Sequence, residues 1–153
     1  MSTTLAELVQ QHTRGVIDRL GCDIDEHIAP LVALLMGAGI ETVASCEGHL
    51  THGLPHPWVD VHGNSYNRLN DLLLDCFAGQ VPRLKIWKFE GEWSEDRTHI
   101  IRHDRQFRLE PIDPTDVAGA WAAMQELVRF LAKRQDVGLP LSSLPVPPHA
   151  SAS

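Results

Sequence analysis

The sequence has few cysteines and no long hydrophobic run, and each shortage excludes a class of protein. Three cysteines in 153 residues are too few, and odd in number, for a secreted scaffold held together by disulfides. The longest apolar run, at 31–36, is far shorter than the roughly 18 residues that a membrane-spanning helix needs. The first residues also lack the basic and apolar regions of a signal peptide. We therefore expect a cytoplasmic protein without a membrane span.

Basic residues are also few. The chain carries 13 basic and 20 acidic residues, and its net charge is −7 with the histidines neutral. Such a charge disfavours nucleic acid and anionic membranes as partners, so a small-molecule ligand is the expected partner. The length and the hydrophobic fraction of 43% are typical of one compact domain with its own apolar core.

Hydrophobic residues recur with the periods of helices and strands, and glycines and prolines separate these segments. Together they predict a single α+β domain over residues 1–137. Residues 138–153 are rich in proline, serine and alanine, and we expect them to form a flexible tail. Asp113 followed by Pro114 is expected to begin the last helix. The order of elements predicts a mainly antiparallel sheet with helices packed on one face. The helices are expected at about 5–20, 26–37, 66–77 and 115–134, and the strands at 40–45, 57–62, 81–90, 98–102 and 106–112.

Two further signals concern the starts of the first and second helices. The pattern Thr4-x-x-Glu7 matches a capping box, in which each residue satisfies a backbone amide near the other. Asp23 or Asp25 is expected to cap the second helix, because aspartate accepts hydrogen bonds from the free amides of a first helical turn.

The segment Ser45-Cys46-Glu47-Gly48-His49 is the most informative part of the chain. It lies where a predicted strand ends and a glycine-bearing loop begins. Loops at strand ends are common places for ligand-binding groups, because the sheet holds them rigidly. Gly48 permits a positive φ angle or a close approach of the backbone to a ligand. Four polar side chains in five residues therefore predict a polar pocket that belongs to an enzyme or a binding protein.

Metal binding is the first interpretation of this segment. Cys46 and His49 place a thiolate and an imidazole at a spacing seen in metal sites, and zinc is the usual ion for such mixed ligands, with iron as an alternative. In a metal site Glu47 is expected to act as the general base for a bound water rather than as a ligand. Further histidines that could complete the ligand set follow at His52, His56 and His62.

Nucleophilic catalysis by Cys46 is a second interpretation. A reactive thiol needs a neighbouring histidine and a carboxylate that orients the imidazole. His62 is the more suitable histidine and His49 the alternative, because adjacent residues rarely form such a group among themselves. Glu47 or Asp60 would supply the carboxylate.

A third interpretation is binding of a polar small molecule without a metal. Ser45, the backbone amides near Gly48 and the His49 ring would hold a phosphate or another polar group. Trp58, which follows this loop, is expected to line the same pocket. Such a site could carry chemistry, or the protein could be a non-catalytic sensor of a nucleotide-like molecule.

A purely structural interpretation also remains open. Ser45 and Glu47 would then satisfy backbone groups in a tight turn, while Cys46 packs as a small apolar residue. We assign structural roles to Cys22, at a helix boundary, and to Cys76, on an apolar helix face.

A second cluster of charged and polar residues covers 97–108, with four arginines and two histidines against one aspartate. Arginine is suited to clamping phosphate or carboxylate groups, and Arg102 is the residue expected to contact such a ligand. The preferred interpretation is a solvated pair of strands whose arginines offset the acidic residues at 90–96.

Residues 25–62 resemble known proteins. The motif Ser-Cys-Glu-Gly-His, followed by a Pro-x-Val-x-Val strand, resembles that of small uncharacterised bacterial and phage proteins. More distantly, the segment is similar to the wybutosine-pathway tRNA N-methyltransferase family, in which a strand ends in Thr-x-Ser-Ser-Cys-Ser-Gly-Arg. Matching positions are Thr42, Ser45, Cys46 and Gly48.

The resemblance implies a shared α+β scaffold and site location. It also implies a further candidate function, transfer of a methyl group from S-adenosylmethionine to a nucleic-acid base. Three positions depart from the family pattern, with Ala44 and Glu47 in place of serines and His49 in place of the arginine. Losing the arginine and gaining a carboxylate weakens phosphate binding. The resemblance therefore supports a shared scaffold more than it supports tRNA as a substrate.

Overall fold

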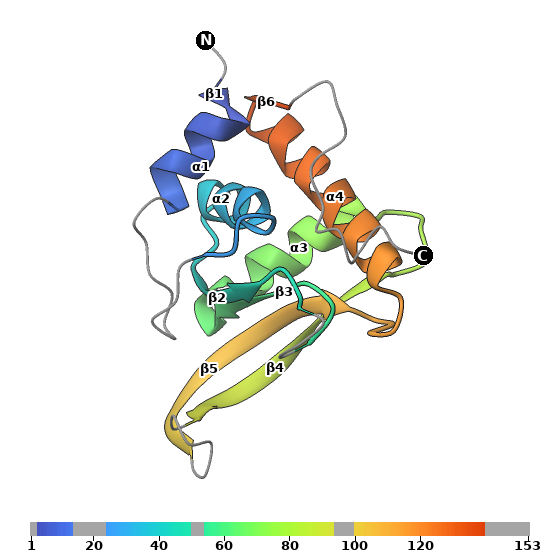
Figure 1. Cartoon of the computed structure of the whole chain (residues 1–153). Helices are drawn as coiled ribbons and strands as arrows, with labels where there is room; N and C mark the ends of the chain where they lie inside the picture. Colours follow the sequence, from blue (N-terminus) through green and yellow to red (C-terminus); the bar gives the residue numbers. More distant parts are fainter. Residues whose placement is uncertain (1–2, 14–23, 50–53, 94–99, 140–153) are drawn as a thin grey trace.

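The computed structural model of the chain describes residues 3–13, 24–49, 54–93 and 100–139 (Figure 1). These residues form an α+β fold, as the sequence predicts. The helices are α1 (Leu5–Thr13), α2 (Ala29–Gly37), α3 (Tyr66–Cys76) and α4 (Val117–Arg134), with a 3-10 turn at Gly63–Ser65. The strands are β1 (Thr3–Thr4), β2 (Thr42–Cys46), β3 (Trp58–His62), β4 (Leu84–Trp93), β5 (Ile100–Pro111) and β6 (Val137–Gly138).

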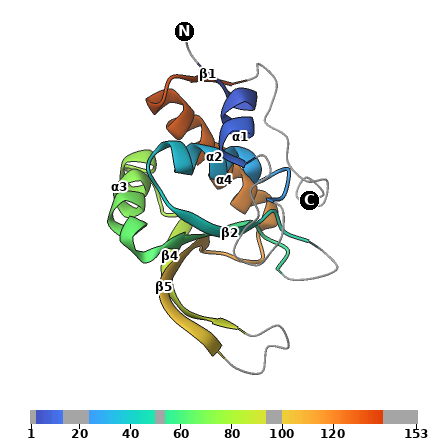
Figure 2. The same cartoon turned by 90° about the vertical axis from the view of Figure 1, so that its left-hand side faces the viewer.

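Four of the strands form one antiparallel sheet in the order β2-β3-β5-β4. The helices lie on one side of this sheet, and the far ends of β4 and β5 extend away from them as a two-stranded ribbon (Figures 1 and 2). Val59, Val61 and Leu109 are fully buried, because they alternate toward the helix-covered side. A short parallel pair, β1 with β6, joins the start of the described chain to the end of α4.

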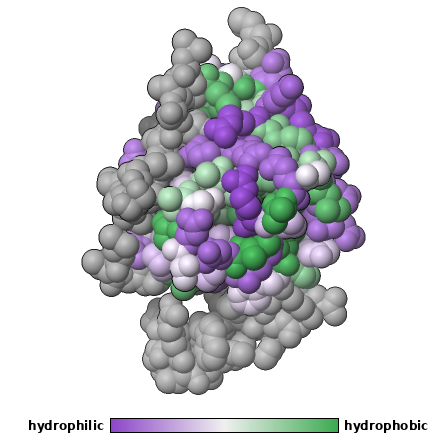
Figure 3. Space-filling model, turned by 90° about the vertical axis from the view of Figure 1, so that its right-hand side faces the viewer, coloured by the Kyte–Doolittle hydropathy of each residue, from purple (hydrophilic) through white to green (hydrophobic). Residues whose placement is uncertain are grey.

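Helix α2 is the centre of the apolar core. Residues 31–35 are all almost completely buried, so this helix is apolar around its whole circumference. A helix with that pattern must be covered on every side, and α1 and α4 both pack against it. On the side of the molecule where α4 lies, hydrophobic residues form small groups between hydrophilic ones (Figure 3). Of the helices in the described ranges, none has the length and apolar character needed to cross a bilayer.

The expected break between two strands at 98–102 and 106–112 is wrong. Residues 100–111 belong to one strand, β5, which runs without interruption from Ile100 to Pro111, and 98–99 lie outside the described residues. Strand β4 is long enough to pair with β5 through this region, with Glu90 opposite Arg105 and Glu92 opposite Arg102. Two register shifts in this part of the β4–β5 pairing accommodate the local irregularity, so the chain needs no turn there.

The start of the last helix also differs from the expectation. Asp113 does not cap it, because its Oδ1 accepts from the amide and hydroxyl of Thr115 at 3.0 and 2.6 Å in a turn before the helix. These hydrogen bonds lower the pKa of the Asp113 carboxyl. The cap is Asp116, whose Oδ1 accepts from the Gly119 amide at 2.9 Å.

At the N-terminus the capping box is confirmed. The Thr4 hydroxyl accepts from the Glu7 amide at 3.1 Å, and the Thr4 amide donates to the Glu7 carboxylate at 3.3 Å. The expected end of this helix lies outside the described residues, as do 140–153 of the predicted tail. Gly138, the first residue of that tail, pairs with Thr4.

The packing of α2 predicts a large difference between two leucine substitutions. We expect Leu34→Ala to lower the free energy of unfolding by about 2–5 kcal/mol, because Leu34 is fully buried and the change leaves a cavity. Leu74→Ala is the matched control, since Leu74 is 64% exposed, and it should cost less than about 0.5 kcal/mol. Urea denaturation followed by circular dichroism measures both. Equal losses would contradict the placement of the core.

Candidate metal site

The site is built on a sharp turn at the end of β2. Gly48 has a φ of +89°, as the sequence predicted for this glycine. A Cβ at this position would overlap the carbonyl oxygen of Pro55, so the turn requires glycine for space as well as for conformation. The His49 amide then donates to the Leu54 carbonyl at 3.0 Å, which fixes the two ends of the following loop against each other.

Three potential metal ligands meet beside this turn. Asp25 comes from the segment before α2, Cys46 from the end of β2, and His49 from the turn itself. One ligand atom of each residue lies within 4.8 Å of the other two, and all three residues are partly exposed. The set combines a carboxylate, a thiol and an imidazole, which are ligand types that zinc uses in proteins.

The separation of the nitrogen and oxygen ligand atoms suits a tetrahedral ion. His49 Nε2 and Asp25 Oδ2 are 3.4 Å apart. Nitrogen and oxygen ligands that are each about 2.0–2.2 Å from a tetrahedral zinc ion lie about 3.3–3.6 Å from each other. Three protein ligands would leave a fourth tetrahedral position for water or a substrate atom.

Hydrogen bonds lock the β2 turn to the segment before α2. The Glu47 amide donates to Asp25 Oδ2 at 3.0 Å. In return, Glu47 Oε2 accepts from the His27 amide at 2.8 Å and lies 2.6 Å from His27 Nδ1. The expectation that Asp23 or Asp25 caps α2 is wrong, because α2 begins later without a side-chain cap. The Asp25 carboxylate serves the β2 turn instead, and Asp23 lies outside the described residues.

The electrostatics of the site keep the free thiol protonated. Burial raises the pKa of the Cys46 thiol, and the carboxylates of Asp25 and Glu47 raise it further, against the opposing effect of the Gly48 amide. That amide donates to Cys46 Sγ at 3.3 Å. A raised pKa disfavours the interpretation of Cys46 as an activated nucleophile, which needs a lowered one. A bound cation would reverse this balance, because metal binding displaces the thiol proton.

The structure places Trp58 beside the site. Trp58 is the register partner of Cys46 across β2 and β3. Its ring stacks on the Arg108 guanidinium, with 4.0 Å from the Arg108 Cζ to the ring centroid. Arg108 in turn donates to both carboxylate oxygens of Asp60, at 2.6 and 2.9 Å. Burial raises the pKa of the Asp60 carboxyl in spite of this partner. Asp60 is thus paired with an arginine rather than orienting a catalytic histidine.

His62 does not join the ligand cluster. It lies at the opposite end of β3 from Trp58, so the strand separates it from Cys46 by roughly 13 Å. Its Nδ1 accepts from the Asn64 amide at 3.2 Å and caps the 3-10 turn. Ser45 precedes Cys46 within β2 and faces the other side of the sheet.

Among the remaining predicted residues that the structure describes, neither Arg102 nor His56 is part of the ligand cluster. Arg102 is opposite Glu92 in the part of β5 beyond Gln106, the last residue that pairs with β3. This register sets residues of opposite charge at facing positions of the two strands. His56 is buried, with its Nδ1 3.1 Å from the Pro57 carbonyl oxygen. His52 and Cys22 lie outside the described residues.

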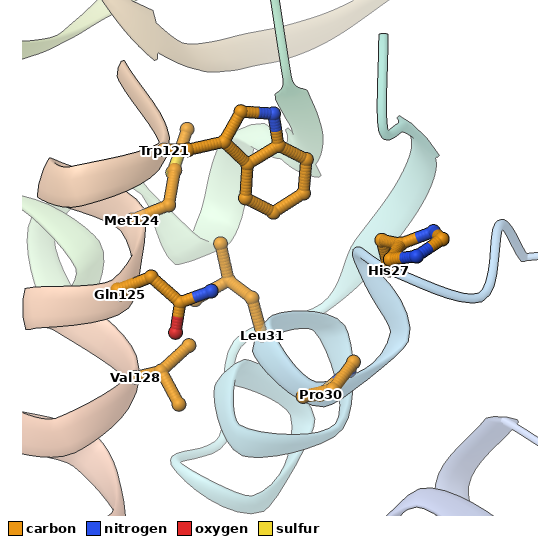
Figure 4. A pocket seen from close by; sticks show the side chains of 7 residues that line it. All are labelled: His27, Pro30, Leu31, Trp121, Met124, Gln125 and Val128. Carbon is orange, nitrogen blue, oxygen red and sulfur yellow. The ribbon is translucent and has the colours of Figure 1, made fainter. Parts of the chain in front are cut away.

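His27 and Asp25 are the site residues that the sequence analysis did not single out. His27 also lines a small cavity between α2 and α4, with space for about one water molecule, about 10 Å³ (Figure 4). The opposite wall carries Trp121, whose indole Nε1 is buried without a hydrogen-bond partner among the described residues. The cavity is lined by His27, Pro30, Leu31, Trp121, Met124, Gln125 and Val128.

Comparisons with known proteins assign the chain to no family. No protein-family profile, no curated protein and no solved structure matches the chain. The resemblance of residues 25–62 to the N-methyltransferase family therefore stays a prediction.

The Gly48 turn allows a test with an internal control. Gly48→Ala and Gly79→Ala both place a side chain at positive φ, which costs about 1–2 kcal/mol. A Cβ at Gly79 meets nothing within 4 Å, whereas one at Gly48 meets the Pro55 backbone. Gly48→Ala should therefore destabilise the protein by at least about 1 kcal/mol more than Gly79→Ala in urea denaturation. Indistinguishable losses would show that the turn is not tightly packed against Pro55.

Proposed function

We propose that the protein binds a divalent transition-metal ion, Zn²⁺ in the first instance, through Asp25, Cys46 and His49. The observation that supports this most directly is the convergence of three ligand types on one point from two segments that are distant in the sequence. The separation between Asp25 and His49 fits tetrahedral coordination. Hydrogen bonds from the protein backbone already hold Asp25 and Cys46 in place.

Among the described residues three ligands converge. Catalytic zinc sites have three protein ligands and keep a position for water, whereas structural sites usually have four, so this set favours a catalytic metal. An ion bound here would polarise that water and lower its pKa. Glu47, which neighbours Cys46 and whose carboxylate is paired with His27 Nδ1, is the residue that we propose as the general base for that water. We therefore infer a metal-dependent enzyme that acts on a small polar substrate by activating water.

Metal binding is tested by titration of the purified, metal-free protein. We expect one Zn²⁺ per chain in isothermal titration calorimetry. Cys46→Ser and His49→Ala should each weaken Zn²⁺ binding by more than about 100-fold. Loss of a residue that only hydrogen-bonds to a metal ligand typically weakens binding by about 10–100-fold, and these variants lose a ligand itself. The controls are Cys76→Ser and His62→Ala, which exchange the same residue types away from the cluster. Circular dichroism verifies that each variant is folded.

Two outcomes would contradict the metal site. The proposal is wrong if the folded wild-type protein binds neither Zn²⁺ nor any other divalent ion of the first transition series. Equal binding by Cys46→Ser and Cys76→Ser would show that the ion sits elsewhere.

The protonated thiol also predicts a pH dependence of metal binding. Because burial raises the pKa of Cys46, the free thiol carries its proton at pH 7 and must lose it when the ion binds. Zn²⁺ binding should release about one proton from this thiol and strengthen by about tenfold per pH unit as the pH rises toward the thiol pKa. Calorimetry in buffers of different ionisation enthalpy counts the protons. Binding by wild-type protein without proton release would exclude thiolate coordination.

A further inference from the structure

His27 lies beside the ligand cluster without belonging to it. Among the described residues, ligand atoms converge from Asp25, Cys46 and His49. His27 lies two residues before the start of α2, on the segment that leads into that helix (Figure 4). Two of its groups contact Glu47, the residue that follows Cys46 in the β2 turn. The question is therefore what His27 contributes to a site in which it is not a ligand.

His27 holds one oxygen of Glu47 with two groups. The His27 amide donates to Glu47 Oε2 at 2.8 Å, and His27 Nδ1 lies 2.6 Å from the same oxygen. An ionised carboxylate only accepts hydrogen bonds, so the ring nitrogen is the donor in this contact. The two side chains are mostly buried, with 24% of His27 and 18% of Glu47 exposed. Partial shielding from water strengthens such a charge-assisted hydrogen bond.

This contact is one half of a reciprocal link between two segments. In the other half, the Glu47 amide donates to Asp25 Oδ2 at 3.0 Å. Glu47 is thus joined to the segment before α2 through both its backbone and its side chain. Two contacts fix the rotation of one segment against the other as well as their separation, whereas a single contact would act as a hinge. Because Glu47 lies between Cys46 and His49 in the sequence, the link also fixes the distance of these ligands from Asp25.

The apolar core anchors the His27 side of the link. Ile28, the next residue along the chain, is fully buried. The Asp25 carbonyl accepts from the Ala29 amide at 3.0 Å, so the segment that carries Asp25 and His27 is joined to the first turn of α2. Ligands are held most precisely when the residues that support them stand on rigid elements of the fold. His27 meets this condition, because the helix that follows it is buried on all sides.

We propose that His27 is a positioning residue of the metal site. By holding Glu47, it keeps the β2 turn at the separation from Asp25 that a bound ion requires. This inference rests on the proposed function, since it concerns the same ion. Residues that hold metal ligands in place typically contribute about 10–100-fold to metal affinity. His27 acts through Glu47 rather than on a ligand directly, so the lower end of this range applies.

Zn²⁺ titration of His27 variants tests this role. His27→Ala should weaken Zn²⁺ binding by about tenfold. His27→Asn should bind Zn²⁺ within about threefold of the wild-type affinity, because its side-chain amide donates from nearly the position of Nδ1. The matched control is His62→Ala, which removes a histidine at the opposite end of β3 from Trp58 and should leave the affinity unchanged. Circular dichroism verifies that each variant is folded.

A double variant separates positioning through Glu47 from a general loosening of the segment. In the Glu47→Ala protein the His27 ring has no carboxylate to hold, so adding His27→Ala should change the Zn²⁺ affinity no further. An equal loss of affinity in both backgrounds would overturn the proposal. X-ray absorption of zinc-loaded His27→Ala should show the wild-type set of ligands. A missing nitrogen ligand would instead identify His27 as a ligand and overturn its positioning role.

Hydrogen exchange in the metal-free protein tests the link without an ion. The Glu47 amide, which donates to Asp25, should exchange at least about tenfold faster in His27→Ala than in the wild type, and at the wild-type rate in His62→Ala. Equal exchange in His27→Ala and the wild type would overturn the link. Zn²⁺ binding that is the same in both proteins would overturn the positioning role and leave the metal site standing. Faster exchange in His27→Ala, with no Zn²⁺ binding by the wild type, would contradict the metal site and confirm the link.

Discussion

The carboxylate of Asp25 is the contact on which the candidate site depends. Its Oδ2 accepts from the Glu47 amide at 3.0 Å and lies 3.4 Å from His49 Nε2. The segment before α2 is thereby joined to the end of β2, although the two are more than twenty residues apart. Without this carboxylate, His49 would be the one ligand left beside the Cys46 thiol among the described residues. The Gly48 turn has a supporting role, since it brings His49 back toward the strand.

The order and type of most elements follow from local patterns in the sequence. The capping box at Thr4, the alternation in β3 and the apolar run of α2 are each decided by neighbours in the chain. Three expectations about the elements failed, and the aspartate cap of α2 is one of them. Asp113 and Asp116 are both suitable caps, and Thr115 draws Asp113 into a turn. The continuity of β5 depends on the length of β4, which no pattern within β5 reveals.

The site was predictable in part for the same reason. Cys46, Gly48 and His49 lie within four residues, so their spacing could be interpreted directly. Asp25 carried a stronger local signal, that of a helix cap, and its role as a ligand arises only from tertiary packing. His62 lies close in sequence, but the length of β3 carries it away from the cluster. Proximity in the sequence is therefore no guide to proximity in space for His62.

The coordination of a bound ion is the central claim, and X-ray absorption spectroscopy of the zinc-loaded protein measures it most directly. The account predicts one sulfur ligand at about 2.3 Å, with the remaining nitrogen and oxygen ligands at about 2.0–2.2 Å and a total of four. It also predicts that the sulfur contribution disappears in the Cys46→Ser variant. A first shell without sulfur, or a sulfur ligand that persists in that variant, would contradict the account.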